Sequence, residues 1–469
     1  MAQQNSFAGK TAIVIGASMG GLLAARALAD HFEQVTLLER DVFPAPGEQR
    51  KGAPQGRHAH AVLAQGLEIM EGYFPGLIEQ LVSLGADYGD VSELARWFHE
   101  GACHQPTHSG VNAINISRPR LEAAVRARVL ALPNVQALEG CDVLGLLATP
   151  DNARVTGVRV IRRRAGSAEE SLNADLIVDT SGRGSRSPVW LEALGYDRPH
   201  EEAVKIGVTY TSCVYERRPE HIPGVNALIV AAAPENPRGG VLLSQEGNRW
   251  ILTVAAYLGE QIPLDQAGLR EFVRGMATRA LFDVIKDAQP VGEPVPHKIP
   301  SNLRRRYEQL KRFPAGYLVM GDALCSFNPI YGQGMSVAAL EARALGDCLA
   351  KGEAKLASRF FKQASKIIDI PWSTAVGNDL RFPEIEGPRT VMTKFINWYV
   401  GKLHHAAHHD AEVSVAFLKV VNLLAPPPSI MTPGIMWRVW RSNLRRAQPT
   451  ANMNDAGAAL VRQSPVKLR

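Results

Sequence analysis

A glycine-rich stretch near the amino terminus has the residue types and spacing of a phosphate-binding turn. Gly16-Ala17-Ser18-Met19-Gly20-Gly21 lies between an apolar run at residues 11–15 and a helically spaced apolar segment at residues 22–28. The next apolar run ends at Glu39, roughly 20 residues after Gly16, where a dinucleotide-binding βαβ unit carries the acid that accepts ribose hydroxyl groups. Ser18 replaces the second glycine of that pattern, so its side chain must turn away or donate to a phosphate. The context favours a dinucleotide site over an ordinary strand-to-helix turn.

A second group of small and polar residues follows the apolar run at residues 317–320. Asp322 comes directly after that run, and residues 328–336, Asn-Pro-Ile-Tyr-Gly-Gln-Gly-Met-Ser, open a helix. A carboxylate at a strand end can bind ribityl hydroxyl groups. A Gly-x-Gly at a helix start presents free amides and the positive end of the helix dipole to an electron-rich ring. The two parts suit one extended ligand with hydroxyl groups and a reducible ring, whereas an ordinary helix start would leave the preceding Gly-Asp unexplained.

The elements that must position these residues follow an α/β pattern. Residues 10–39 predict strand, turn, helix and strand, and the Gly-, Pro- and Gln-rich residues 47–60 predict a loop. Further helices are predicted at residues 61–84 and 120–132 and after residue 335. A β-meander over residues 136–163 leads to a buried strand at 174–179. A separate mixed or antiparallel sheet is predicted from strands at residues 204–215, 227–233, 240–244 and 249–256.

The composition is that of a folded globular protein without disulfides. The 469 residues are 46% hydrophobic, and the net charge of +6 is a mild excess rather than the basic footprint of a nucleic-acid-binding protein. The five cysteines show no paired spacing, which favours free thiols in a reducing cytoplasm and no metal site. No stretch approaches the ~18 uninterrupted apolar residues of a spanning helix. We therefore expect a cytoplasmic protein that binds no nucleic acid and whose membrane contact is at most peripheral.

Three separated segments resemble one enzyme family. Residues 11–40, 174–188 and 317–342 are similar to the flavoprotein monooxygenases of the para-hydroxybenzoate hydroxylase superfamily. Residues 54–60, Pro-Gln-Gly-Arg-His-Ala-His, and residues 321–336 most resemble the branch of the polyether-type polyene epoxidases. The resemblance implies an α/β (α+β) fold, in which a Rossmann-like FAD-binding domain carries an inserted β-sheet substrate domain and C-terminal helices. The expected boundaries are residues 8–85, 111–190 and 301–350 for the FAD-binding domain, 86–110 and 191–300 for the substrate domain, 351–446 for the helical region and 447–469 for a disordered tail.

The resemblance also implies which residues bind FAD. They are Gly16, Ser18, Gly20 and Gly21 at the pyrophosphate, Glu39 and Arg40 at the adenosine, Arg50 at the phosphates, Arg118 and Asp322 at the ribityl chain, and Gly332, Gly334 and Met335 under the pyrimidine edge of the isoalloxazine, with Pro329 on the face that reacts with oxygen. Each of the three arginines has the alternative of a solvated surface charge. No metal ligands are expected.

Two positions depart from the family pattern. Ser181-Gly182 stands where the aromatic hydroxylases carry an Asp-Gly pair involved in FAD and nicotinamide binding, and Cys325 stands where many relatives have histidine. The first departure leaves open whether NADPH or NADH reduces the flavin directly or through a partner flavin reductase. The second removes a titratable group without removing a known requirement for the chemistry.

The activity that the resemblance implies is oxygen transfer. Reduced FAD would react with dioxygen to a flavin hydroperoxide, whose distal oxygen passes to a small hydrophobic alkene or aromatic substrate, by epoxidation or hydroxylation, in secondary metabolism. Candidate pocket residues are His58, Trp97, Phe98, Phe327, Asn328, Pro329 and Trp372, with Ile229, Val230, Leu242, Leu252 and Val254 from the second sheet. His58 and His60 could instead serve only to pack their loop. An FAD-dependent reductase, a halogenase and a non-catalytic flavin-binding protein remain alternatives, although the halogenase motif Trp-x-Trp-x-Ile-Pro is absent.

Two clusters in the C-terminal region have competing interpretations. His404, His405, His408 and His409 form two i,i+4 pairs that could chelate a metal, but a solvated helix face is favoured because no metalloprotease glutamate accompanies them. The basic aromatic stretch of Trp437, Arg438, Trp440, Arg441, Arg445 and Arg446 could touch anionic lipid. A terminal helix that packs its tryptophans on the core is the favoured interpretation.

Overall fold

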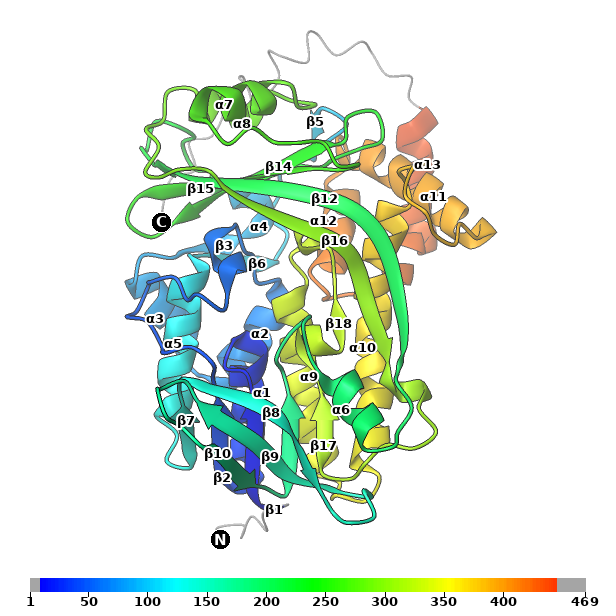
Figure 1. The fold of residues 1–469 in the computed structure, drawn as a ribbon. Helices are drawn as coiled ribbons and strands as arrows, with labels where there is room; N and C mark the ends of the chain where they lie inside the picture. Colours follow the sequence, from blue (N-terminus) through cyan, green and yellow to red (C-terminus); the bar gives the residue numbers. More distant parts are fainter. Residues whose placement is uncertain (1–8, 445–469) are drawn as a thin grey trace, which may run out of the picture.

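A five-stranded parallel sheet carries the glycine-rich turns. In this computed structural model, which describes residues 9–444, the strand order is β17 (Tyr317–Val319), β11 (Leu176–Asp179), β1 (Gly9–Ile15), β2 (Phe32–Leu38) and β7 (Val135–Leu138). Their apolar side chains are almost fully buried, as expected of a parallel sheet covered on both faces. All neighbours run parallel, so Gly16, Glu39, Thr180 and Gly321 follow strand ends at one edge of the sheet. Figure 1 shows this sheet in the lower half of the view.

Helices and a small antiparallel sheet complete this part of the molecule. Helix α1 (Met19–Ala29) packs on β1 and β2 and contacts α5 (Arg118–Leu130) and α9 (Gly334–Leu349). The three-stranded antiparallel sheet of β8 (Cys141–Ala148), β9 (Val155–Arg162) and β10 (Glu169–Asn173) contacts strands β2 and β11. The first glycine-rich turn therefore lies between β1 and a helix that is itself buried.

A second, eight-stranded sheet lies in the upper half of Figure 1. Its order is β18 (Cys325–Ser326), β16 (Val295–Arg306), β12 (His200–Glu216), β15 (Arg249–Ala256), β14 (Arg238–Gln245), β13 (Ala227–Val230), β4 (Ala95–His99) and β5 (Ala102–Cys103). Strands β12 and β16 are antiparallel partners whose register shifts between Lys205 and Val208. In Figure 1 these two long, curved strands run from the parallel sheet to the upper sheet. Strand β16 was absent from the sequence prediction because charged residues interrupt its apolar alternation.

The remaining elements are short segments in the first half of the chain and helices in the second. They are α2 (Ala64–Tyr73), α3 (Leu77–Ser83), β3 (Asp87–Asp90), α4 (Val91–Leu94), β6 (Asn112–Asn115), α6 (Ser187–Ala193), α7 (Gln266–Arg274), α8 (Ala280–Ile285), α10 (Leu356–Asp379), α11 (Val391–Ala407), α12 (Ala411–Val421) and α13 (Pro433–Leu444), with 3-10 turns at Pro54–Arg57, Tyr307–Gln309, Gly321–Ala323, Pro329–Tyr331 and Pro427–Met431. The single helix predicted over residues 61–84 is two helices, because Pro75 and the left-handed Gly76 (φ +78°) interrupt it. None of the described helices is both long and apolar enough to cross a membrane.

Helix α13 differs from the favoured sequence interpretation. Trp437 and Trp440 are 57% and 53% exposed, so these tryptophans do not pack on the core. The inner face of the helix is occupied by Val439 instead, which is 4% exposed. Arg445, Arg446 and the predicted tail at residues 447–469 lie outside the described residues.

Candidate functional site

The first glycine-rich turn places α1 directly against the end of β1. Gly16 has a φ of +93°, and a Cβ on Gly21 would lie 1.8 Å from the Gly16 carbonyl oxygen, so only glycine fits at position 21. The Thr180 hydroxyl donates to the carbonyl oxygens of Ile15 and Gly16 at 2.8 and 3.0 Å and thereby ties the turn to β11. Ser18 is the N-cap residue of α1, but its side chain makes no capping hydrogen bond. The first amides of α1 are therefore free of a capping side chain.

Ser18 is bonded instead to a buried group of two arginines and two glutamates. Its Oγ donates to Glu122 Oε2 at 3.2 Å and accepts from Arg118 Nη2 at 3.0 Å. Arg50 pairs with Glu39 and, at 3.3 Å, with Glu122, while Arg118 pairs with Glu122 at 3.0 Å. Glu39 also accepts a backbone amide of the glycine-rich turn at 2.9 Å. Each buried arginine of the group therefore has a glutamate as its partner.

The second turn brings Asp322 into the same region. The Asp322 carboxylate is accessible from an internal cavity but lies deep within the protein, and the loss of bulk water raises its pKa, while Arg118 and Arg183 act in the opposite direction. Behind the turn, Glu341 of α9 accepts the Gly321 amide at 2.6 Å. Burial raises the pKa of Glu341 to about 8, a shift that the Gly321 hydrogen bond opposes and the Asp322 charge adds to. Glu341 therefore holds the backbone from which Asp322 projects.

The start of α9 is open in the same way as the start of α1. Gln333 is its N-cap residue without a capping hydrogen bond, and Gly332 just before it has a φ of +65°. Gly332, Gln333, Gly334 and Met335 all line the cavity. Two helix N-termini without capping side chains thus face one cavity, and each offers backbone donors and a positive dipole end.

The cavity joins both turns to the inner face of the eight-stranded sheet. Its volume is about 1060 Å³, at the upper end of what one small-molecule site occupies. Away from the turns its wall is mainly apolar. This wall includes Ile229, Val230, Val241, Leu243, Ala255 and Ile299 from the eight-stranded sheet and Ile396, Val400, Phe417, Val420, Val421 and Ile430 from the C-terminal helices and the turn that follows them. The space can therefore hold a cofactor ring and an apolar ligand together.

The cavity wall includes most of the residues that the sequence predicts for it. Lining residues are His58, Trp97, Phe327, Asn328 and Pro329 among the pocket candidates, and Ser18, Gly20, Arg118, Asp322, Gly332, Gly334 and Met335 among the cofactor candidates. Four cofactor candidates belong to the turn or to the ion-paired group but do not line the cavity, namely Gly16, Gly21, Glu39 and Arg50. Arg40 is exposed on the surface.

Several predicted pocket residues lie elsewhere. Trp372 is buried in the core, because the face of α10 that lines the cavity contains Ile370, Ser373, Thr374 and Gly377. Residues Phe98, Leu242, Leu252 and Val254 belong to the core that includes residues of α7 and α8. Side chains alternate along a strand, so their neighbours Val241, Leu243, Thr253 and Ala255 face the cavity instead.

His58 is a buried, neutral residue of the cavity wall. Its Nδ1 lies 2.8 Å from Ser212 Oγ, and its ring contacts Tyr210 edge-on at 4.8 Å between centroids. Burial, together with the nearby His297, His60 and Arg57, lowers the pKa of His58 to about 3. Burial and Arg118 likewise lower the pKa of His60 to about 4. Both imidazoles are therefore uncharged at neutral pH, and the His58 hydrogen bond shows that the ring packs the loop against the second sheet.

A buried carboxylate that the sequence did not reveal holds the second turn against the rest of the protein. Asp379, the last residue of α10, is fully buried and accepts four hydrogen bonds. Its donors are Asn302 at 2.7 Å, Tyr331 at 2.7 Å, Tyr257 at 2.9 Å and Asn328 at 3.0 Å. Burial raises the pKa of Asp379, and the four hydrogen bonds oppose that shift. The four donors come from distant parts of the chain, so no local sequence pattern could signal this network.

One of the C-terminal histidines, His404, forms a buried stack with His99 of β4 and contacts His104, which follows β5. His404 is 6% exposed, stacks on His99 at 3.8 Å between centroids, and lies 3.1 Å from His104 Nε2 through its Nδ1. Burial is the largest cause of the lowered pKa of His404. Burial is also the largest cause that lowers the pKa of His99 and of His104 to about 3. The expectation of a solvated histidine face is therefore wrong for His404, which packs as a neutral ring.

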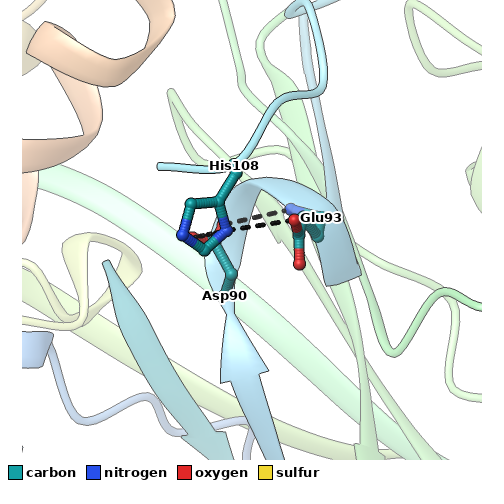
Figure 2. A group of neighbouring side chains, drawn as sticks. All are labelled: Asp90, Glu93 and His108. Carbon is teal, nitrogen blue, oxygen red and sulfur yellow. Dashed lines mark hydrogen bonds and ion pairs between the residues drawn. The ribbon is translucent and has the colours of Figure 1, made fainter. Parts of the chain in front are cut away.

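Only one group of possible metal ligands converges in the described part of the chain. Asp90, Glu93 and His108 approach one another as Figure 2 shows, with His108 Nδ1 at 3.1 Å from Glu93 and 3.5 Å from Asp90. Asp90 is already used, because it caps α4 and accepts from the amides of Ser109 and Gly110 at 2.8 and 2.7 Å. His108 and Glu93 are both exposed. The group therefore fastens the loop that follows β5.

Comparisons with known proteins agree with this architecture. The chain is 36% identical over 342 residues to Protein Rv3254 of Mycobacterium tuberculosis (strain ATCC 25618 / H37Rv), a match that covers 71% of each chain. Its fold is similar to that of the flavin-dependent brominase Bmp2, at 14% identity, a TM-score of 0.64 and coverage of 93% of this chain and 99% of that one. It is also similar to p-nitrophenol 4-monooxygenase PnpA from Pseudomonas putida DLL-E4, at 16% identity, a TM-score of 0.59 and coverage of 88% and 99%. Residues 10–359 match the model of the FAD binding domain family, and the chain belongs to that family.

Proposed function

We propose that this protein is an FAD-dependent monooxygenase that inserts one atom of dioxygen into a small hydrophobic alkene or aromatic substrate, by epoxidation or hydroxylation. One observation carries the proposal: a single cavity joins two open helix N-termini and the Asp322 carboxylate to an apolar wall. A site that only stored flavin would have no use for the additional apolar volume. The fold shared with PnpA, which is named as a monooxygenase, supports the same reaction class.

The residues of the two turns fit FAD. Gly21 lets α1 pack directly on the Gly16 turn, and the uncapped amides of α1 suit a pyrophosphate. Asp322 is an acceptor that ribityl hydroxyl groups could reach from the cavity. The open start of α9 at Gly334 would face the electron-rich edge of the ring. Arg50 and Glu39 are already paired with each other, so we propose that they shape the adenosine end together, as a positive and a negative group side by side.

When bound, FAD supplies the electron transfer and the activation of oxygen. Overall, the substrate, dioxygen, NADPH or NADH and one proton yield the oxygenated product, water and the oxidised nicotinamide. The electrons arrive either from the nicotinamide directly or through a flavin reductase. The chain itself positions the substrate between the second turn and the sheet, and its apolar wall excludes water from the reacting centre. Neutral His58 adds a polar atom to that wall without adding a charge.

Arg381 gives the apolar region one positive charge. It lines the cavity, lies 3.4 Å from His99 Nε2 and donates to Asn378 Oδ1 at 3.3 Å. Its ion-pair partner is the exposed Glu100 at 3.8 Å, which does not line the cavity. The other charged lining residues are Arg118, Arg183 and Asp322 near the turns and the half-exposed Asp369, which pairs with Arg304 at 2.7 Å. We therefore include in the proposal a substrate whose apolar body carries one hydrogen-bond acceptor.

Oxygen incorporation tests the activity directly. The purified holoprotein is supplied with NADPH or NADH, with and without a flavin reductase, under ¹⁸O₂ and with a panel of polyenes and phenols. A monooxygenase places one ¹⁸O atom in the product. A reductase would oxidise the nicotinamide without labelling any product, a halogenase would form a halogenated product when bromide or chloride is added, and a flavin-binding protein would show no substrate-stimulated turnover. Any of these last three results would overturn the proposal.

The assignment of Asp322 is tested by FAD content. Asp322→Ala should purify largely colourless, because it removes the carboxylate that would bind the ribityl hydroxyl groups. Asp369→Ala is the matched control, since Asp369 also lines the cavity but pairs with Arg304 and Arg306 of β16. Stoichiometric FAD in Asp322→Ala, or equal loss in both variants, would refute the role of Asp322.

A further inference from the structure

Two adjacent helices near the C-terminal end expose an unusual amount of apolar surface. We call their exposed apolar side chains the α11–α13 face. It consists of Val391, Met392, Phe395, Ile396 and Trp398 of α11 and Met436, Trp437, Trp440 and Leu444 of α13. These nine residues are half of the exposed large hydrophobic residues in the described part of the chain. Helices α11 and α13 pack against each other and lie together at one side of the molecule, as Figure 1 shows.

The exposed apolar residues lie within regular helix. In α11 they occupy the first two turns, from Val391 to Trp398, while Tyr399 and Leu403 of the following turns are 5% and 0% exposed in the core. In α13, residues 437, 440 and 444 recur on one side, opposite the buried Val439. The first half of α11 and the outer side of α13 therefore present apolar side chains outward. They include three tryptophans, a residue type that is enriched at membrane surfaces.

The charges on these two helices have one sign. Neither helix contains an aspartate or glutamate, whereas α11 carries the exposed Lys394 and Lys402 and α13 carries Arg438 and Arg441. The nearest acid in contact is Asp410, which is 8% exposed and accepts from Arg438 at 3.1 Å and pairs with Arg441 at 3.9 Å. One carboxylate does not balance four cations. A second copy of this face would bring like charges together across a two-fold axis, whereas anionic lipid headgroups would complement them.

The face is also continuous with the cavity. Ile396 belongs to the α11–α13 face and also lines the cavity. Its neighbours Asn397 and Val400 line the cavity as well. Residues 426–428 and Ile430, which lead from α12 to α13, line the cavity too. Helix α11 and residues 426–430 therefore lie between the α11–α13 face and the cavity.

We propose that the α11–α13 face docks on an anionic membrane surface, with its tryptophans in the headgroup region, and that the hydrophobic substrate enters the cavity from the membrane beside α11. The entry route rests on the proposed monooxygenase function, because it needs a lipophilic substrate. The docking itself does not, since it can be measured without turnover.

Vesicle binding by the holoprotein tests the docking. Vesicles of phosphatidylcholine with about one-third phosphatidylglycerol, and vesicles of phosphatidylcholine alone, are sedimented with the protein at low and high salt. We expect binding to the anionic vesicles, weaker binding at high salt, and at least tenfold lower partition for the double variant Trp437→Ser, Trp440→Ser. The matched control is Val189→Ser, Val291→Ser, which removes two apolar side chains of similar exposure elsewhere on the surface.

The outcomes separate the docking from the catalytic proposal. Circular dichroism and FAD content should be unchanged in the tryptophan variant, because both side chains are exposed. Absence of binding to anionic vesicles, or equal loss in the control variant, would refute the docking whether or not the protein is a monooxygenase. A dimer in sedimentation velocity that the tryptophan variant converts to a monomer would assign the face to a second copy instead. Vesicle binding without product labelling would leave the docking intact and refute the entry route together with the monooxygenase function on which it rests.

Discussion

Asp379→Asn tests whether the buried carboxylate network holds the second turn. An asparagine keeps one acceptor oxygen for Tyr257, Asn328 and Tyr331, but it places an NH₂ group where Asp379 Oδ2 now accepts from Asn302 Nδ2 at 2.7 Å. Two donors then face each other. Reversing the Asn302 amide would relieve this, but it would break the 2.6 Å bond that Asn302 Oδ1 accepts from the Asn328 amide. The network therefore has no rearrangement that satisfies every group.

The expected loss of stability follows from these contacts. Losing a hydrogen bond to a charged group costs about 1.5–3 kcal/mol, and leaving a buried donor unpaired costs about 1–3 kcal/mol. Removing a buried negative charge offsets part of this cost. We expect Asp379→Asn to lower the free energy of unfolding by about 2–4 kcal/mol, measured by urea unfolding of the holoprotein with far-UV circular dichroism.

Tyr331→Phe provides the comparison for this prediction. It removes one of three donors from Asp379 Oδ1 and leaves the carboxylate bonded to the other two, so the loss should be about 1 kcal/mol. A double variant should lose less than the sum of the two single losses, because both changes act on one network. A loss below about 0.5 kcal/mol for Asp379→Asn would show that water or a rearranged side chain replaces the carboxylate, and the network argument would fail.

Three further predictions use single positions. Gly21→Ala should purify without FAD, because its Cβ would lie 1.8 Å from the Gly16 carbonyl oxygen, whereas Gly20→Ala, with 4.0 Å to the nearest atom, should remain yellow. Leu242→Ala should lower the free energy of unfolding by about 2–5 kcal/mol with little change in KM, while Leu243→Ala should change KM for the substrate, because only Leu243 lines the cavity. The pKa of Glu341 is raised from 4.5 to about 8, so the folded protein favours its protonated form. The contribution of this group to the free energy of unfolding is fully present below pH 4.5 and is lost as the pH rises to 8. Urea unfolding at pH 5 and pH 8 should therefore show a smaller difference for Glu341→Gln than for the wild type.

Each of these predictions has a result that contradicts it. Equal FAD content in the two glycine variants would mean that α1 can shift to accept a Cβ at position 21. Equal effects of the two leucine variants on KM would mean that the strand alternation does not separate core from cavity. An unchanged pH dependence in Glu341→Gln would mean that Glu341 is ionised in the folded protein.

Local patterns in the sequence predicted the glycine-rich turns and their places at the ends of strands. A parallel strand ends where its apolar run ends, so the positions of Gly16, Glu39 and Asp322 at strand ends were readable from the residues alone. The FAD-binding roles of Arg118 and Arg50 came from the resemblance. The structure excludes the alternative of solvated surface charges, because both side chains are buried in ion pairs. Their roles in binding FAD stay predictions.

The errors arose where the tertiary structure decides which face of an element is buried. Leu242 and Leu243 are equally apolar, and only the packing of α7 and α8 on one face of the sheet determines that Leu242 belongs to the core. Trp372 was a candidate for the cavity wall, although its phase on α10 directs it to the core. Asp379 has no sequence signal, since its donors are up to 122 residues away.

The paired strands β12 and β16 limit how this molecule can open. They join the region of the parallel sheet to the upper sheet by a ladder of hydrogen bonds, so the two parts cannot rotate about a flexible linker. The ladder is interrupted where its register shifts between Lys205 and Val208, at Gly207 with its φ of +56°. The strands could bend at this point without breaking a hydrogen bond of the ladder. The distance between the second turn and the apolar sheet wall should therefore vary little. Opening for a bulky ligand is then left to the helical side of the cavity. There α11 is held by side-chain packing and by isolated hydrogen bonds, such as that from Asn397 to the Gly377 carbonyl oxygen at 2.8 Å, and it can move without unpairing a strand.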